Sequence, residues 1–318
     1  MDILFILDPF DSLKPKKETS IAMMRAAVAR GHRVFGCLQG DISLDQGKVT
    51  ARVTPLELTG ELSPWYKAGE VRIEPLSVFD AVLMRKDPPF DMEYVYSTYM
   101  LERAVEQGAR VYNNPAAIRD HNEKFSITAY PQLTTDVMVT RDPARLREFV
   151  ARHGEAVLKL LDGMGGASIF RARQDDPNLS VILETMNRFG TRTVMAQRYL
   201  PAIAQGDKRI LLIDGEVVPH ALARIPQAGE ARGNMAAGGK QPLSARDEEI
   251  ARYLGPRLAA KGLFLVGLDV IGDSLTEINV TSPTGFMEIT AQTGFDVPDF
   301  FVAQLERRVA ADRSAAGA

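Results

Sequence analysis

Short apolar runs alternate with helical repeats in the first third of the chain. Ile3–Leu7 predicts a buried strand, and the segment IAMMRAAVAR after Thr19 or Ser20 predicts a helix that stops at Gly31. The next apolar run, HRVFGCL, predicts another strand. Because a strand, a helix and a second strand in this order form a βαβ unit, we expect a parallel sheet with helices on its faces.

The same alternation continues to about His121. Val78–Met84 predicts a strand and Met92–Gln107 an amphipathic helix. At Asn114-Pro115 an N-cap residue precedes a proline, which is a favoured start for a helix. We therefore expect residues 1–121 to form an open parallel α/β domain.

Beyond residue 121, turns join most of the predicted strands. Strand patterns cover Ala156–Leu161, Ser168–Ala172 and Thr193–Leu200, and a helical pattern covers Asn178–Phe189. This mixture predicts a central α+β domain over residues 122–200.

A third segment begins near Pro201. It holds a hairpin signal at Asp214-Gly215 and a helix start at Ser244, where Asp247 nearly completes a capping box. A last helix begins at about Val297. We expect residues 201–318 to form a third domain that shares one cleft with the central one.

Polar residues interrupt an otherwise apolar hairpin, LDVIGDSLTEINVTSP, at residues 268–283. A three-residue turn over Gly272, Asp273 and Ser274 would place Asp269 opposite Glu277. Asn279 would lie on the same face. Close carboxylates repel unless a cation lies between them, and such oxygen ligands suit Mg²⁺. A solvated outer face of the hairpin explains the pattern equally well.

A glycine-rich turn lies in KLLDGMGGASIF, Lys159–Phe170. The segment lacks the GxGxxG fingerprint of dinucleotide-binding folds and the GK[ST] ending of a P-loop. Glycines allow backbone N–H groups to approach phosphate oxygens, and Lys159 would add a positive charge. An ordinary tight hairpin is the alternative.

Further cations follow at Lys124, Lys208, Arg209 and Arg224. Singly, each is typical of a solvated surface charge. Together with the glycine turn and the acidic hairpin they form the parts of a nucleotide and metal site. The strand MAQRYL could border a nucleobase or could simply be a core strand.

Ile225–Gln241 has almost no large apolar residue, so we expect a mobile segment. Both a linker and an active-site lid fit at this position, directly after Arg224.

Composition narrows the class of protein. The chain has 318 residues, 45% hydrophobic and 25% charged, with a net charge of −3, which excludes a basic nucleic-acid footprint. Cys37 is the one cysteine and lies in a predicted strand, so we expect an inert core thiol and a reducing compartment. The first apolar run is too short for a signal peptide or a membrane span. These features predict a soluble cytoplasmic protein with no nucleic-acid or membrane partner.

Several of these motifs together resemble the ATP-grasp superfamily. They are a lysine on a strand before a glycine loop, a strand beside the adenine, and the spacing D-x7-E-x-N on paired strands. Within the superfamily the chain is similar to the bacterial glutathione synthetase family nearly from end to end. The shared strings are LMRKDPPFD (83–91), NEK (122–124), LDGMGGASIF (161–170), YLPAI (199–203), GDKR (206–209), ARIPQ (223–227), GLD (267–269) and TEINVTSPT (276–284).

This resemblance implies an N-terminal pre-ATP-grasp domain followed by a two-lobed ATP-grasp fold. It implies a homotetrameric ATP-dependent ligase that uses Mg²⁺, or Mn²⁺ in its place. The reaction would join γ-glutamylcysteine to glycine through an acyl phosphate and release glutathione, ADP and phosphate.

The resemblance also assigns roles to residues. Arg209 would lie near the phosphates and Arg224 would stabilise the transferring charge, and the metal ligands would be Asp269, Glu277 and Asn279. The peptide-substrate positions would be Arg85, Ser282 and Pro283. The phosphates of ATP would contact Lys124, Lys159, Gly163, Met164, Gly165 and Gly166. The adenine would contact Gln197, Arg198, Tyr199 and Leu200, and the ribose would lie near Asp207.

Four positions depart from the family pattern. Leu160 replaces a usual proline, and the chain after Gly239 is a few residues shorter. Met287 replaces a polar or basic residue and Glu18 replaces an aspartate, so the contacts to the peptide substrate are the least defined. Two other functions stay open at this point: a ligase for different amino acids or peptides, and a nucleotide-binding regulator without turnover.

Overall fold

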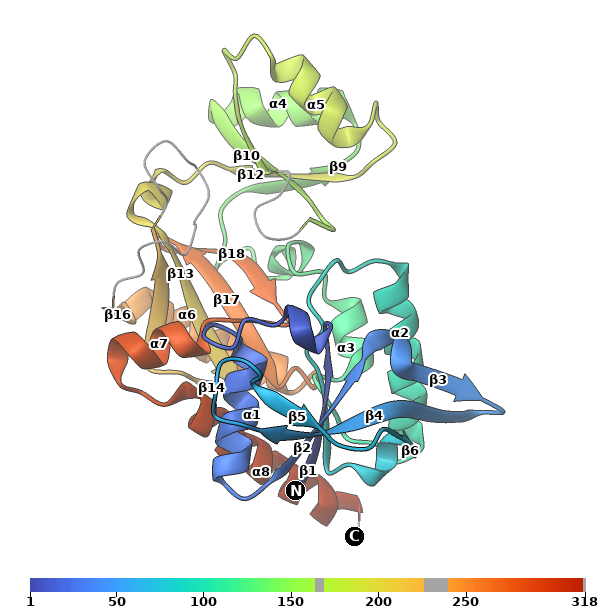
Figure 1. Ribbon diagram of the computed structural model, residues 1–318. Coiled ribbons are helices and arrows are strands. Elements are labelled where there is room, and N and C mark those ends of the chain that lie inside the picture. The colour runs from blue at the N-terminus through green and yellow to red at the C-terminus, as the bar shows by residue number, and fades with distance from the viewer. Residues whose placement is uncertain (164–168, 226–239, 317–318) are drawn as a thin grey trace.

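The computed structural model describes residues 1–163, 169–225 and 240–316. Three sheets organise the molecule (Figure 1). Six strands of the first sheet run in the order β3-β4-β2-β1-β7-β8, and β5 and β6 also pair with β4. The strands are β1 (Asp2–Leu7), β2 (Arg33–Leu38), β3 (Ile42–Asp45), β4 (Lys48–Leu58), β5 (Tyr66–Ala68), β6 (Arg72–Pro75), β7 (Ala81–Met84) and β8 (Val111–Tyr112).

Alternating residues of β1 pack into two different cores. Ile3, Phe5 and Leu7 join the cluster formed with helix α1 (Thr19–Ala29), whereas Leu4 and Ile6 join the one formed with helix α2 (Met92–Glu106). Side chains of a strand point to opposite faces in turn, so helices cover both faces of the sheet. β1 pairs in parallel with β2 and β7, which confirms the predicted βαβ unit.

Two details of this part differ from the prediction. The side chain of Glu18, rather than Thr19 or Ser20, caps α1 by accepting a hydrogen bond from the Ser20 backbone N–H. The predicted strand at Val78 begins only at Ala81, because Leu76–Val78 forms a 3-10 turn. As predicted, the Asn114 side chain caps helix α3 (Pro115–Asp120).

The second sheet is antiparallel and runs in the order β11-β10-β12-β9. Helices α4 (Pro143–His153) and α5 (Leu179–Asn187) lie together on one of its faces (Figure 1). Leu158 and Ala196 point into that core, so Lys159 and Gln197, one residue along, point to the other face. The strands are β9 (Val137–Thr140), β10 (Glu155–Leu160), β11 (Ile169–Arg173) and β12 (Val194–Arg198).

The third sheet is also antiparallel and runs in the order β16-β15-β13-β17-β18, with β14 paired to β13. Helix α6 (Ala245–Ala259) covers one face and begins at the capping box that Ser244 and Asp247 complete. The strands are β13 (Asp207–Ile213), β14 (Glu216–Val217), β15 (His220–Arg224), β16 (Lys240–Pro242), β17 (Leu265–Ile271) and β18 (Ser274–Asn279).

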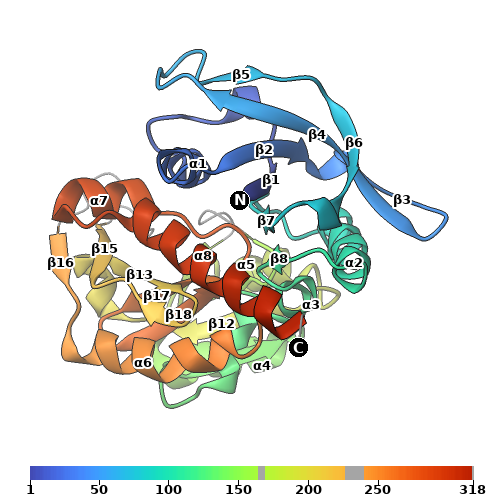
Figure 2. The same ribbon diagram turned by 90° about the horizontal axis from the view of Figure 1, so that it is seen from below.

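Helices α7 (Phe286–Thr293) and α8 (Val297–Ala316) connect the third sheet to the first. Figure 2 shows α8 running between the two sheets. One apolar cluster contains Phe5 of β1, Met24 of α1, Leu211 of β13 and Phe301 of α8. The first and third sheets therefore share a core. The remaining short 3-10 turns are Phe10–Ser12, Gln39–Asp41, Phe125–Ala129 and Pro201–Gln205.

No helix in the described part of the chain combines the length and apolar character that crossing a membrane requires.

We predict that Gly255→Ala destabilises the protein. Alanine normally favours a helix over glycine by about 1 kcal/mol, but here the added Cβ would lie 2.3 Å from the Gly215 carbonyl oxygen. We expect the free energy of unfolding in urea to fall by about 2 kcal/mol. Gly40→Ala is the matched control, since its Cβ would meet nothing within 4 Å. A Gly255→Ala protein as stable as the control would contradict this packing.

Candidate active site

A row of charged residues crosses three strands of the third sheet. Arg209 of β13 pairs with Asp269 of β17, which pairs with Glu277 of β18. The predicted opposition of the two carboxylates is confirmed, but the turn is different. It has two residues, and the register shifts between Asp269 and Val270. This bulge at Thr276 replaces the third turn residue and gives the same pairing.

Both oxygens of Asp269 bind arginine. Arg209 donates from Nε and Nη2 at 2.8 Å each, and Arg224 donates from Nη2 at 2.9 Å. Arg224 also pairs with Asp207, at 2.9 Å from Nε. Burial alone would raise the pKa of Asp269, but the two guanidinium groups outweigh it and hold that pKa below the ordinary range. Asp269 is therefore a fixed negative charge between two cations.

Two lysines reach Glu277 from outside its sheet. Lys159 Nζ lies 3.7 Å and Lys124 Nζ 3.9 Å from the same Oε1 atom. Lys124 Nζ also donates to the Gly163 carbonyl oxygen at 2.5 Å. Both lysine side chains are buried, and burial lowers the pKa of the Lys159 ammonium while Glu277 opposes this. Two buried ammonium groups facing one carboxylate form a site with spare positive charge, suited to an anion.

The acidic hairpin has a donor set that fits a hard divalent cation. Asp269 accepts three N–H bonds, and a carboxylate has about four acceptor positions, so one remains. Among the described residues, the lysines contact only Oε1 of Glu277, and Asn279 donates from Nδ2 to Gly267 at 3.2 Å while its amide oxygen accepts no hydrogen bond from them. Within the described residues no group of three or more His, Cys, Asp or Glu is placed to hold a metal. The third donor at this site would be an amide.

The predicted adenine-side residues lie where the second sheet leads into the third. Gln197 is buried on the face that carries Lys159, and Arg198 ends β12 and donates from Nε to Thr135. Tyr199 stacks under the Arg171 guanidinium at 3.8 Å. Leu200 follows, directly before the 3-10 turn that leads to β13.

The predicted peptide-substrate residues join the first sheet to the segment after β18. Arg85 is buried and donates from Nη2 to the Pro283 carbonyl oxygen at 3.0 Å and from Nε to Ser20 at 3.2 Å. Its Nη1 has no hydrogen-bond partner among the described residues. Ser282 donates to Asp87. Burial lowers the pKa of Arg85, but a guanidinium still remains charged. Its Nη1 group can therefore donate to an anion that binds here.

Some predicted residues lie outside the described ranges. Met164, Gly165 and Gly166 of the glycine turn are among residues 164–168, and most of the predicted lid is in residues 226–239. Of the two departures from the family pattern near the peptide, Glu18 caps α1 beside Ser20, and Met287 lies in the first turn of α7. Cys37 is buried and burial raises the pKa of its thiol, which confirms the inert core cysteine.

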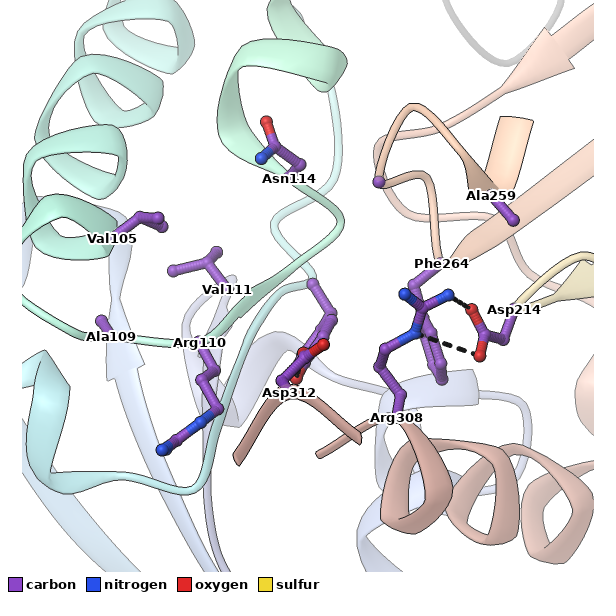
Figure 3. A pocket seen from close by; sticks show the side chains of 12 residues that line it. Val105, Ala109, Arg110, Val111, Asn114, Asp214, Ala259, Phe264, Arg308 and Asp312 are labelled. Carbon is purple, nitrogen blue, oxygen red and sulfur yellow. Dashed lines mark hydrogen bonds and ion pairs between the residues drawn. The ribbon is translucent and has the colours of Figure 1, made fainter. Parts of the chain in front are cut away.

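A separate pocket of about 240 Å³ lies between the end of α2, β8 and the end of α8 (Figure 3). Arg308 and Asp214 form an ion pair at one wall, and Val105 and Val111 line the opposite side. None of the predicted site residues lines it. The polar row, and not this pocket, carries the chemistry that the sequence predicts.

Several residues that hold the site together were not predicted from the sequence. Asn122 donates from Nδ2 to the Leu161 carbonyl oxygen at 2.8 Å, and Glu123 binds the segment after β18. Asn113 bridges Leu265 and Val280. Asn122 and Glu123 directly precede Lys124 in the string NEK, so their position beside a predicted ligand was the available signal.

Two family models match the chain. The prokaryotic glutathione synthetase N-terminal domain matches residues 1–119, and the prokaryotic glutathione synthetase ATP-grasp domain matches residues 123–294. The chain belongs to the prokaryotic glutathione synthetase family.

Relatives in this family are similar over almost the whole chain. A glutathione synthetase of Bordetella parapertussis is 57% identical over 314 residues, which cover 96% of this chain and 99% of that protein. A glutathione synthetase of Ralstonia nicotianae is 58% identical over 310 residues, 96% of each chain. Family membership thus does not rest on one shared domain.

Solved structures show the fold independently of sequence. The crystal structure of D-cycloserine synthetase superimposes with a TM-score of 0.69 at 16% identity and covers 96% of this chain and 99% of that one. An ATP-grasp protein with a RimK domain from Sphaerobacter thermophilus superimposes with a TM-score of 0.62 at 15% identity, covering 96% and 99%. The prediction of an α/β domain followed by an ATP-grasp fold is confirmed.

We predict that Asp269→Asn destabilises the protein far more than Glu277→Gln. The first change leaves Arg209 and Arg224 buried without their shared charge, which costs about 3 kcal/mol or more. The second removes only contacts of 3.7 and 3.9 Å to lysines. Urea unfolding of both variants and the wild type measures the difference.

The same comparison has an expected pH dependence. Because the folded pKa of Asp269 lies below the ordinary aspartate value of 3.8, its contribution is fully present above that value and is lost only as pH falls further. The stability gap between wild type and Asp269→Asn should therefore be constant from neutral pH down to about that value and narrow below it. A gap that closes between pH values of about 7 and 5 would contradict the assignment.

Proposed function

We propose that this protein is an ATP-dependent ligase that joins γ-glutamylcysteine to glycine, forming glutathione, ADP and phosphate. The carrying observation is the pair of buried lysines that converge on Glu277, beside Asp269 on the neighbouring strand. That arrangement supports the binding of a polyphosphate with a divalent cation. The relatives named glutathione synthetase support the choice of acceptor.

The reaction needs an activated carboxylate. The cysteinyl carboxylate of γ-glutamylcysteine attacks the γ-phosphorus of ATP, ADP leaves, and an acyl phosphate results. The glycine amine then attacks the acyl carbon, the C–O bond to phosphate breaks, and the amine loses a proton. Phosphoryl transfer of this kind depends on positioning and charge neutralisation more than on covalent chemistry by the protein.

The cations of the site have separate proposed roles. Lys124 and Lys159 bind ATP phosphates as point charges, and the turn of Gly163, Met164, Gly165 and Gly166 contributes backbone N–H donors. Arg209 lies near the phosphates and Arg224 stabilises the charge on the transferred group. The contacts of Arg224 to Asp207 and Asp269 use only part of its five N–H donors, which leaves donors for a phosphate oxygen.

Asp269, Glu277 and Asn279 are the proposed ligands of Mg²⁺, for which Mn²⁺ can substitute. A metal held there would supply positive charge to offset the negative charge of the ATP phosphates. The adenine is proposed to lie along Gln197, Arg198, Tyr199 and Leu200, with the ribose near Asp207. Arg85, Ser282 and Pro283 are proposed to contact γ-glutamylcysteine, and the unpartnered Nη1 of Arg85 supports this for a carboxylate of the peptide.

Three further properties belong to the same proposal. We propose domain boundaries at 121 and 200, a homotetramer, and a cytoplasmic location. Exposed apolar side chains of the first sheet and the segment beside it, Val71 at 49% and Ile73 at 70%, support an interface between copies. The single buried thiol of Cys37 is compatible with a reducing compartment.

An omission assay tests the activity. Purified protein receives ATP, Mg²⁺, γ-glutamylcysteine and glycine, and each component is left out in turn while phosphate and glutathione are measured. We expect one phosphate per glutathione, and no turnover without the peptide. Comparable turnover with other acceptors would point to a different ligase of this fold, and ATP binding without any phosphate release would point to a regulator.

We predict that Glu277→Gln raises the Mg²⁺ concentration needed for half-maximal activity by at least tenfold and lowers kcat. Replacing one charged ligand by a neutral amide weakens a hard-cation site. A magnesium titration of glutathione formation measures both effects. Glu249→Gln, an exposed acidic residue of α6, is the control. Wild-type activity and magnesium dependence in Glu277→Gln would overturn the metal assignment.

A further inference from the structure

One carboxylate oxygen, Oε1 of Glu123, accepts three hydrogen bonds from the segment after β18. The donors are the Val280 N–H at 2.9 Å, the Thr281 N–H at 3.1 Å and the Thr281 hydroxyl at 2.8 Å. The Glu123 backbone oxygen also accepts from the Ile278 N–H at 2.9 Å. Hydrogen bonds to a charged acceptor are about twice as strong as neutral ones, so this residue fixes the path of the chain where the strand ends.

The two neighbours of Glu123 form hydrogen bonds to the segment that leads into the glycine turn. Asn122 binds the Leu161 carbonyl at the base of the glycine turn, and Lys124 binds the Gly163 carbonyl and faces Glu277. Three consecutive residues thus link the phosphate side to the segment after β18. A displacement of Glu123 would therefore shift both the phosphate side and the segment after β18.

The far end of that segment is held by the first sheet. Ser282 donates to Asp87, and the Pro283 carbonyl accepts from Arg85. At its near end the Val280 carbonyl accepts from Asn113 at 2.8 Å, so both backbone groups of Val280 are bound. Residues 280–283, here called the acceptor loop, therefore have few ways to shift as long as Glu123 is in place.

We propose that Glu123 is a positioning residue that aligns the acceptor loop with the phosphate-binding lysines, so that the peptide carboxylate and the γ-phosphate meet in line. The inference rests on the proposed function, because the alignment matters only if the acceptor loop binds the peptide. In this proposal Glu123 makes no contact with either substrate. Its effect passes through Val280 and Thr281 to Ser282 and Pro283.

Substitution of Glu123 should therefore impair the use of γ-glutamylcysteine much more than the binding of ATP. Glu123→Ala leaves two backbone N–H groups and one hydroxyl without their acceptor, and the acceptor loop can then take other paths. We expect kcat/KM for γ-glutamylcysteine to fall at least tenfold and the KM for ATP to stay within threefold. Small misplacement of a reacting group is costly because reaction requires a close and directed approach.

Three companion variants sharpen the test. Glu123→Gln keeps an acceptor oxygen at the same place, so its kcat/KM for γ-glutamylcysteine should lie close to the wild-type value. Glu123→Asp keeps the charge but is one methylene shorter, so it should show the peptide defect and provides the answer if the alanine variant does not fold. Thr281→Val removes the hydroxyl donor alone and keeps both backbone bonds, so it should stay within threefold of wild type.

Phosphate and glutathione are measured together for every variant, with thermal unfolding as a check of folding. A folded Glu123→Ala or Glu123→Asp protein whose kcat/KM for the peptide is unchanged overturns the proposal. So does an equal rise of the KM for ATP and for the peptide, which indicates a general loss of structure. A wild-type protein that makes no glutathione refutes the proposed function instead, and the variants are compared only if the wild type is active.

Discussion

The buried bonds of Asp269 to Arg209 and Arg224 are the interaction on which the polar face of the third sheet depends. Two guanidinium groups lie inside the protein there and share this carboxylate, while Arg224 also pairs with Asp207. Without it Arg209 would lose the carboxylate it binds and Arg224 would keep only Asp207, in a region of low dielectric constant. On the other side of Asp269, the bulge at Thr276 shifts the register of β18 and sets Glu277 opposite Asp269.

From this fixed point the site extends across two sheets. Lys159 belongs to the second sheet, yet its ammonium faces Glu277 of the third. The alternation of β10 explains this, since Leu158 fills the core under α4 and α5 and its neighbour must point the other way. Lys159 and Glu277 meet because the two sheets turn polar faces toward each other.

The first sheet takes part through the shared core and through Arg85. Helix α8 packs against α1 and α7, and its Phe301 belongs to the same apolar cluster as Leu211 of β13, so the first and third sheets share a core on that side. Arg85, directly after β7, also links the first sheet to the segment after β18 by donating to the Pro283 carbonyl oxygen. This explains how a substrate-binding contribution from the N-terminal part can be aligned with chemistry on β17 and β18.

Local signals in the sequence were sufficient for many elements. The capping box at Ser244, the Asn114-Pro115 start and the apolar run of β1 each act within a few residues, and each is present in the structure. Helix α4 was missed although it has an Asp142 cap, a proline at its start and Gly154 at its end. β3, β5 and β6 were missed because strands of three or four residues carry only weak alternation. β4 was missed although its buried Val49, Ala51 and Val53 alternate along 11 residues.

The sequence by itself determined the residue types of the site and the same-face spacing of Asp269, Glu277 and Asn279, because strand periodicity is a local property. It also determined the family, through strings distributed over the whole chain. Only the tertiary structure decided which cation meets which carboxylate. Arg224 binds Asp269 and Lys124 faces Glu277 across separations of 45 and 153 positions in the chain, and Glu123 reaches Thr281 across 158. Such pairings result from how sheets pack against each other, and no pattern along a single element contains that information.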